Sequence, residues 1–532
     1  MKQSFLGTGV LALTLAAALA GCGGDDSSGG GTPDEGGQTS NAAPSSDFVD
    51  GGTFTMSLPG DPGKLDPQSS ASTQLFAVNQ LAYDNLVFID GKTGAVEPQL
   101  ASEWNVDGTT VTLTLTQGIT CSDGTPFTAT MAADNISYVG DPKNKSPYLG
   151  TFLPVGAKAK ADDAAGTVTI TLAQPAPFVL NGLGSLPMVC ASGMSDRASL
   201  KDTTAGTGPY ELTEAAPGDH YTYQIREGYT WGPNGATTDE SGLPDTIVMK
   251  IVQNEGTAAN LLVSGEINAA TIQGPDAKRL DAADLFSVST TAMVGEQWYN
   301  HNDGHETSDP AVRMALTQAI DFGELASVAT AGAGGPATTF AGLAPVACPG
   351  DSISGSLPAQ DVDAAKDALA DSLAGKKLTF LYSSAAGTAV AAAAELAVQE
   401  WEAAGADVTA KGVDETALQG AVFGTGDWDI AWIPLNVNSP DQLVPFLSGP
   451  GLADQGTNFS GIDNKDYTDG VAAATAMNGT DGCQTWLDAE SELVAAADIV
   501  PFATNAVKTY GNGAQFDYPG TFMPTSIRML AK

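Results

Sequence analysis

Basic residues are scarce in this chain of 532 residues. It holds 22 lysines and arginines against 62 aspartates and glutamates, which gives a formal net charge of −40. Binding to nucleic-acid phosphates requires clustered lysine and arginine, whereas here these residues are scattered singly, so we expect no nucleic-acid partner. The acidic charge favours solubility, and it would also attract cationic or zwitterionic solutes.

Histidine is scarcer still, since the chain has only His220, His301 and His305. The last two are four residues apart, but the Asn, Asp and Gly between them predict a loop rather than the helix on which a zinc protease presents two imidazoles. The sequence also lacks a phosphate-binding P-loop, a dinucleotide-binding G-x-G-x-x-G and a G-x-S-x-G nucleophile elbow. We therefore expect no metal, no cofactor and no catalytic activity.

Long apolar runs are absent except near the N-terminus, where Lys2 precedes an apolar stretch over residues 5–20. This stretch has the length of a secretion signal and is shorter than the roughly 20 residues of a membrane-spanning helix. It ends in Leu19-Ala20-Gly21-Cys22, which resembles the lipobox of bacterial lipoproteins. We predict a signal peptide over residues 1–21, a lipid on Cys22 and attachment to the extracytoplasmic face of a bacterial cell membrane. The alternative is ordinary cleavage after Ala20, which would release a soluble protein.

Residues 23–47 contain no aliphatic side chain larger than alanine. They cannot build a hydrophobic core, so we predict that residues 22–47 form a lipidated flexible tether. The rest of the chain, from residue 48 to residue 532, is long enough for two or more lobes.

Besides Cys22, the chain has four cysteines, at Cys121, Cys190, Cys348 and Cys483. An even number in an exported protein predicts two disulfides, and no pair has the spacing of a metal site. Three connectivities are possible in principle.

Hydrophobic periodicity changes along the chain. Alternating apolar and polar residues predict half-buried strands over residues 111–115 and 168–172. Asp309 and Pro310 predict the start of an amphipathic helix, whose apolar side chains recur at helical spacing from Val312 to Ile320. A strand over 377–382, an alanine-rich helix over 388–404 and extended segments at 407–410 and 429–433 predict a mixed α/β second half.

Several separated motifs occur in the same order as in a known family. They are Gly51-Gly52-Thr53-Phe54, Leu65-Asp66-Pro67, Tyr83-Asp84-Asn85-Leu86, Glu97-Pro98-Gln99-Leu100-Ala101, Gly118 followed by Asp123-Gly124-Thr125-Pro126-Phe127-Thr128-Ala129, Gly206-Thr207-Gly208-Pro209-Tyr210, Tyr229-Thr230-Trp231-Gly232, Ser264-Gly265-Glu266-Ile267-Asn268, Val312-Arg313 with Ala319-Ile320-Asp321, and Ile499-Val500-Pro501. Over residues 51 to about 510 the chain thus resembles the bacterial extracellular solute-binding proteins of family 5, which include dipeptide, oligopeptide and nickel binders. Each motif also has a structural explanation as a turn or as core, so the motifs indicate the fold and not the ligand.

The resemblance implies an α/β, two-lobed periplasmic-binding-protein-like fold of the large class II type, with hinge strands between the lobes. Lobe I would comprise residues 48–296 and 503–532, with an extra β-rich subdomain at about 91–205, and lobe II residues 297–502. Pairing of Cys121 with Cys190 and of Cys348 with Cys483 is favoured, because each disulfide then stays inside one lobe. The implied function is that of a monomeric lipoprotein that captures a peptide or peptide-like solute as its lobes close and delivers it to the permease of an ABC importer.

The resemblance also suggests solute-binding residues. Tyr148 and Trp432 match positions that line the cleft in peptide binders, and Asn436 and Phe502 are further candidates. An aromatic ring offers apolar area with a polar edge, which suits varied ligands. The structural alternatives are a surface turn for Tyr148 and the core for Trp432.

One departure from the family pattern concerns the peptide ammonium group. Peptide binders carry an aspartate a few residues after the tryptophan, where this chain has Pro434-Leu435-Asn436-Val437-Asn438. The next acid, Asp441, matches a later structural position. Because a buried ammonium group without a counter-charge is costly, a peptide with a free N-terminus is disfavoured unless another carboxylate takes over.

Three other functions stay open. The protein could be a surface sensor or adhesin of the same fold, a binder of a non-peptide solute such as a sugar, an amine or a metal chelate, or a secreted hydrolase. A gene neighbourhood without permease and ATPase genes would favour the sensor, and turnover of a substrate would favour the hydrolase.

Overall fold

The computed structural model describes residues 47–531 except residues 71, 92, 274–275, 284, 344–345, 455, 478 and 519–521. Within this part, the chain forms an α/β body around a mixed sheet of 11 strands. The order is β15 (Asp407–Val413), β14 (Lys377–Ser383), β16 (Ile430–Trp432), β12 (Phe286–Tyr299), β17 (Ile499–Gly511), β11 (Ala269–Ile272), β1 (Thr53–Leu58), β10 (Thr246–Ile251), β9 (His220–Ile225) and β8 (Tyr210–Ala216), and β13 (Gly334–Gly335) pairs with β17.

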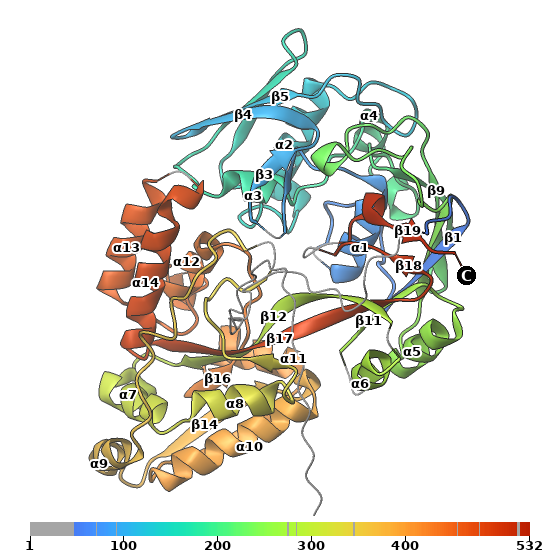
Figure 1. Cartoon of the computed structure of the whole chain (residues 1–532). Helices are drawn as coiled ribbons and strands as arrows, with labels where there is room; N and C mark the ends of the chain where they lie inside the picture. Colours follow the sequence, from blue (N-terminus) through green and yellow to red (C-terminus); the bar gives the residue numbers. More distant parts are fainter. Residues whose placement is uncertain are drawn as a thin grey trace, which may run out of the picture. The chain divides into compact units, whose positions relative to one another are not determined.

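The two long strands β12 and β17 form an antiparallel pair that we call the crossing ribbon. Strand β16 pairs with residues 297–299 of β12 at one end, and β11 pairs with residues 508–511 of β17 at the other. The ribbon therefore links two groups of strands, and Figure 1 shows it running between them. Its register shifts between Met293 and Gly295 and again between Gly295 and Glu296, which marks a β-bulge near the middle of β12.

The second half contains the predicted βαβ unit. Strands β14 and β15 are parallel and are connected through α10 (Thr388–Ala403), so this prediction is confirmed. Helix α7 (Pro310–Gln318) begins as predicted, because the Asp309 side chain accepts a hydrogen bond from the Ala311 backbone N–H. It ends before Ile320, since Asp321 caps the next helix, α8 (Phe322–Ala329).

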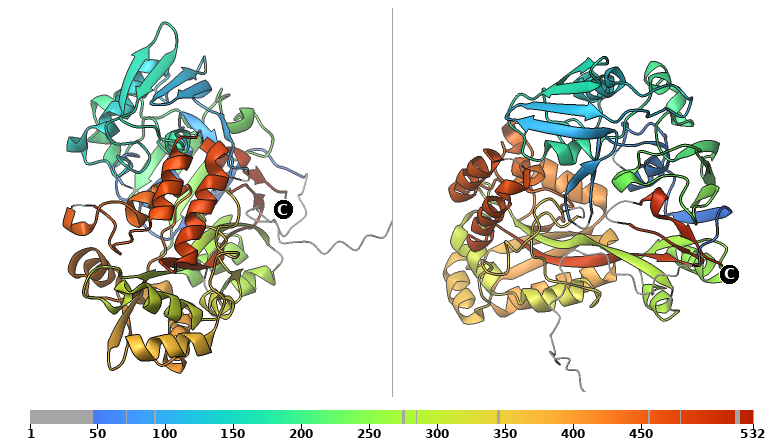
Figure 2. Two further views of the ribbon diagram at one scale, coloured as in Figure 1. Left: turned by 90° about the vertical axis from the view of Figure 1, so that its left-hand side faces the viewer. Right: turned by 45° about the horizontal axis from the view of Figure 1, so that its top comes forward.

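Two hydrophobic cores lie on opposite faces of the strands around β16. Neighbouring residues of a strand point to opposite faces, and accordingly Trp298 and Tyr299 belong to different cores. The Tyr299 core includes side chains of α7, α8, α9 (Val362–Ser372) and α10. The Trp298 core includes side chains of α11 (Glu415–Gly420), α12 (Val444–Leu447), α13 (Lys465–Thr475) and α14 (Cys483–Ala495), and α13 and α14 lie side by side in Figure 2.

The first half contains a separate antiparallel sheet in the order β4 (Ala101–Asp107), β5 (Thr110–Leu115), β7 (Thr167–Thr171) and β6 (Lys158–Asp162). Strands β5 and β7 are the two that alternation predicts, and their side chains alternate between buried and partly or fully exposed positions. One core joins this sheet to α2 (Ala129–Gly140), and another joins β1 and β8–β10 to α1 (Thr73–Ala82). The remaining elements are β2 (Val87–Ile89), β3 (Val96–Pro98), α3 (Val179–Leu183), α4 (Ala191–Ser195), α5 (Glu255–Ser264), α6 (Asp276–Asp281), β18 (Ala514–Gln515) and β19 (Arg528–Met529).

Candidate functional site

One buried carboxylate explains several of the motifs on which the family resemblance rests. Asp84 accepts hydrogen bonds from Gln99 Nε2 at 3.0 Å, Tyr229 Oη at 2.9 Å, Thr207 Oγ1 at 2.9 Å and Trp231 Nε1 at 3.0 Å. Burial raises the pKa of Asp84, and the hydrogen bonds from Thr207, Tyr229 and Trp231 act against that rise. Because four motifs separated in sequence meet at one side chain, their role in this region is structural.

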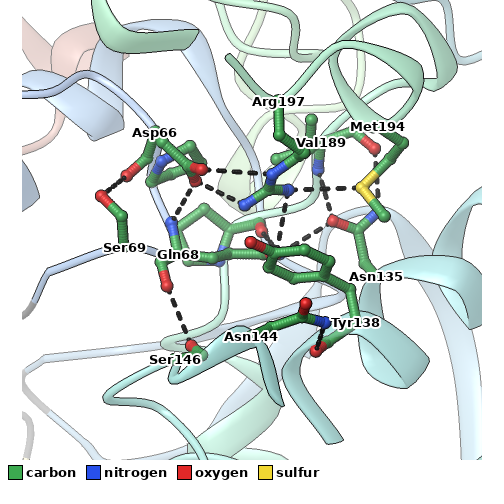
Figure 3. Close-up of polar contacts among 12 residues, drawn as sticks. Asp66, Gln68, Ser69, Asn135, Tyr138, Asn144, Ser146, Val189, Met194 and Arg197 are labelled. Carbon is green, nitrogen blue, oxygen red and sulfur yellow. Dashed lines mark hydrogen bonds and ion pairs between the residues drawn. The ribbon is translucent and has the colours of Figure 1, made fainter. Parts of the chain in front are cut away.

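A second polar network fixes the loop that carries Leu65-Asp66-Pro67 (Figure 3). The Arg197 guanidinium is hydrogen-bonded to both carboxylate oxygens of Asp66 and lies 4.0 Å above the centre of the Tyr138 ring. Gln68 accepts a hydrogen bond from Arg197 and donates one to Asn135 Oδ1 at 2.8 Å. The charges of this network are therefore satisfied internally.

Tyr148 lies beside the loop that carries Leu65-Asp66-Pro67. Its hydroxyl donates to the Pro67 carbonyl at 2.7 Å, and its ring stacks on Phe76 and meets the edge of Phe152. Only 1% of Tyr148 is exposed. The structure thus places this predicted ligand-binding residue in the core of the β-rich region, where a solute could reach it only if neighbouring side chains moved.

Trp432 and Phe502, by contrast, lie together. The ladder from β16 through β12 to β17 brings their ring centres to 4.9 Å, although they are far apart in sequence. Both rings are buried in the Tyr299 core, and Trp432 Nε1 donates to Gln297 Oε1 at 3.2 Å. Phe502 is itself a residue of β17, and both rings pack on one face of the strands with almost no exposed surface.

Asn436 is the exposed member of the predicted set. It lies in the loop after β16, which approaches the bulge of β12. Its Oδ1 accepts from the Met293 backbone N–H at 2.9 Å, and its Nδ2 donates to the Met293 carbonyl at 3.2 Å. A side-chain amide therefore replaces ladder hydrogen bonds where the ribbon is irregular.

Glu296 is a residue at this bulge that the sequence reasoning missed. It is completely buried, and its Oε2 accepts from the Leu435 backbone N–H at 2.8 Å and from Trp298 Nε1 at 3.2 Å. Its Oε1 has no hydrogen-bond partner among the described residues. Burial raises the pKa of Glu296 to about 8, so its neutral form dominates at neutral pH. An acid within the apolar and aromatic end of a strand was the available signal.

The histidines serve structural roles. His301 Nε2 contacts the Asp498 carbonyl at 3.0 Å, and burial lowers the pKa of His301 to about 3. His305 Nδ1 contacts Asp429 Oδ1 at 3.2 Å. The two therefore bond to different partners in the predicted loop, and the described residues contain no group of three or more His, Cys, Asp or Glu arranged to hold a metal.

The four cysteines of the described body form two disulfides, Cys121 with Cys190 and Cys348 with Cys483, which is the pairing that the sequence analysis favours. Cys22 and its predicted lipid lie outside the described residues. In the part that the structure describes, no helix combines the length and the apolar character needed to cross a membrane.

Known proteins are similar to this chain in sequence and in fold. Glutathione-binding protein GsiB of Escherichia coli is 31% identical over 287 residues, which is 52% of this chain and 53% of GsiB, so the chain matches about half the length of this curated relative. A substrate-binding protein of Microbacterium hydrocarbonoxydans, solved with 4-hydroxybenzoate hydrazide, is 29% identical with a TM-score of 0.70 over 90% of this chain and 99% of that one.

The ABC transporter substrate-binding protein CtaP of Listeria monocytogenes has the same fold, with 21% identity and a TM-score of 0.75 over 91% of this chain and all of CtaP. These structures are two-lobed periplasmic binding proteins of mixed α/β content, so the predicted fold class is confirmed. The family model of the bacterial extracellular solute-binding proteins, family 5, matches residues 95–451. The chain therefore belongs to the bacterial extracellular solute-binding proteins of family 5.

Proposed function

We propose that this protein is the non-catalytic receptor of an ABC importer, which captures a small solute between two lobes and passes it to a membrane permease. The observation that carries this proposal is the crossing ribbon, which links two groups of strands whose hydrophobic cores are separate. A pair of strands between separate cores allows bending without disrupting either core. Membership of a solute-binding family supports the same function.

The lobes in this proposal are residues 48–296 with 503–532, and residues 297–502. Both disulfides are consistent with this division, because neither joins one of the two parts to the other. A lipid on Cys22 would hold the receptor on the extracytoplasmic face of the membrane, beside its permease.

The solute site in this proposal lies along the bulge of β12, next to the loop of residues 433–438. Asn436 is exposed there, and its amide can exchange the Met293 main chain for the main chain or amide of a solute. Main-chain recognition of this kind tolerates varied side chains. Trp432 and Phe502 would form the packed core on one face of the ribbon, and Tyr148 would support the opposite lobe.

The solute is a peptide-like molecule without an obligatory free ammonium group. Within residues 433–438 there is no acid. Two acids beside this loop offer no ready counter-charge. Asp441, the next acid in sequence, is held by the Ser439 hydroxyl with its pKa raised by burial, and Glu296, which accepts from the Leu435 backbone N–H, is neutral at pH 7. The names of two relatives, one a glutathione binder and one solved with an aromatic hydrazide, support a small solute with amide-like groups.

Native mass spectrometry of the purified protein, followed by a thermal-shift screen of peptides, amines, sugars, glutathione and 4-hydroxybenzoate hydrazide, tests this proposal. A bound solute raises the melting temperature according to RT ln(1 + [L]/Kd). We expect one small molecule per chain, recovered unchanged, and equal binding of N-acetylated and free peptides. Turnover of the solute would contradict a receptor, and a strict requirement for a free amine would contradict the proposed solute class.

A further inference from the structure

A small aromatic contact joins the two halves of the chain at a distance from the crossing ribbon. Phe178, directly before α3, packs against Trp486 of α14, with ring centres 6.0 Å apart. Phe178 is 3% exposed and Trp486 is 1% exposed. Rings buried to this extent behave as core even though they come from segments about 300 residues apart in sequence.

The helices beside the two rings pack in different cores. Val179 and Leu183 of α3 belong to the core of the β-rich sheet. Leu493 and Val494 of α14 belong to the Trp298 core. The contact between Phe178 and Trp486 is thus a separate hydrophobic cluster that connects two bodies, each of which is packed without it.

The cluster is completed by a segment that a disulfide holds in place. Ala347, Cys348 and Ala474 pack with the two rings, and the bond from Cys348 to Cys483 ties this segment to the first turn of α14. The Ala347 backbone N–H also donates to the Asn438 carbonyl, at the end of the loop proposed to border the solute. One side of the contact is therefore rigid and is connected directly to that loop.

The two halves also approach each other beside the rings. Gly94, in the turn between β2 and β3, lies so close to Val346 that a Cβ atom at Gly94 would be 2.8 Å from the Val346 carbonyl oxygen. Because Val346 directly precedes Ala347, this second point of approach lies next to the aromatic contact.

The contact also has a cost. Trp486 Nε1 is buried and has no hydrogen-bond partner among the described residues. This N–H group would gain water if the halves separated, which opposes the apolar gain of the two rings. Because the gain from burying the two rings is opposed by the cost of burying this N–H group, the contact can form and break, unlike a continuous core.

We propose that Phe178 and Trp486 form an apolar latch. It stabilises the closed arrangement, in which the two halves touch through these rings, and thereby sets solute affinity without touching the solute. A receptor binds in proportion to the fraction of molecules in the competent arrangement, so weakening the latch lowers the apparent affinity. The affinity effect rests on the receptor function proposed above, whereas the stabilisation of the closed arrangement does not.

A distance measurement without solute tests the stabilisation of the closed arrangement separately from the effect on affinity. Spin labels are placed on cysteines introduced at Val155, which is 67% exposed in the β-rich half, and at Lys411, which is exposed on β15. Distances are compared among the parent, Phe178→Ala and the control Phe152→Ala, since Phe152 packs on Tyr148 inside the β-rich half. Phe178→Leu keeps much of the apolar volume, so it replaces Phe178→Ala as the test variant if the alanine variant fails to fold.

We expect the parent and Phe152→Ala to share the same ratio of short to long distances. That ratio should fall about tenfold in Phe178→Ala, as loss of a buried aromatic pair implies, and by a smaller factor in Phe178→Leu. Identical distance distributions in the parent and both Phe178 variants would overturn the latch. Because no solute is present, this result is independent of the solute class proposed above.

Discussion

Replacement of Glu296 by glutamine should remove a specific pH dependence of stability. Burial raises the pKa of Glu296 from its ordinary 4.5 to about 8. Between these pH values the native protein holds a proton that the unfolded chain has released, so the free energy of unfolding falls as the pH rises. At about 1.4 kcal/mol per pH unit, this loss reaches about 5 kcal/mol near pH 8 and does not grow further above it.

Glutamine resembles the protonated acid and cannot ionise, so Glu296→Gln should lose less stability than the parent as the pH rises. The two proteins should be similar near pH 5, and the variant should be more stable by about 5 kcal/mol near pH 8. Urea unfolding followed by circular dichroism at several pH values measures this difference.

Glu490→Gln is the matched control. Glu490 is also buried, accepts a hydrogen bond from Ser352 Oγ, and has a pKa raised by burial to about 7. Its replacement should flatten the pH dependence only up to about pH 7. A Glu296→Gln variant whose stability falls with pH as steeply as the parent's would refute the account of the buried acid.

Three further predictions concern the buried carboxylate Asp84, one disulfide and the lipid anchor. Asp84→Ala removes the acceptor shared by four buried donors, one of which, Trp231 Nε1, keeps another acceptor, the Thr207 carbonyl. It should lower the free energy of unfolding by about 3–5 kcal/mol, measured by urea unfolding; a loss below about 1 kcal/mol would contradict the role of Asp84. Cys348→Ser with Cys483→Ser opens a loop of 135 residues and should cost about 2–5 kcal/mol, seen as a lower melting temperature, whereas an unchanged melting temperature would contradict it. Cys22→Ser should release the protein from the membrane fraction into the soluble fraction without changing its solute affinity, and persistence in the membrane fraction would argue against the lipid anchor.

Local patterns predicted the regular elements well. The alternation in β5 and β7, the cap and proline of α7 and the βαβ unit around α10 all depend on neighbouring residues, and the structure contains each of them. The end of α7 was predicted too late, because the apolar spacing continues to Ile320 while the Asp321 cap starts a new helix.

The site was harder to predict, because burial depends on distant segments. Tyr148 sits in a core because α1 brings Phe76 against its ring, and no local pattern contains that information. Trp432 and Phe502 meet only through the ladder of β16, β12 and β17. Glu296 was missed because a single acid in a strand is equally compatible with a solvent-facing position, and the bulge that buries it is a property of the strand pair.

Hydrogen exchange with and without the solute found by native mass spectrometry shows whether that solute binds between the two lobes. If the protein captures a solute between its lobes, amide exchange should slow in residues 433–438 and in residues 293–299 of β12, with one solute bound per chain and released intact. Unchanged exchange in both segments at saturating solute would contradict the account.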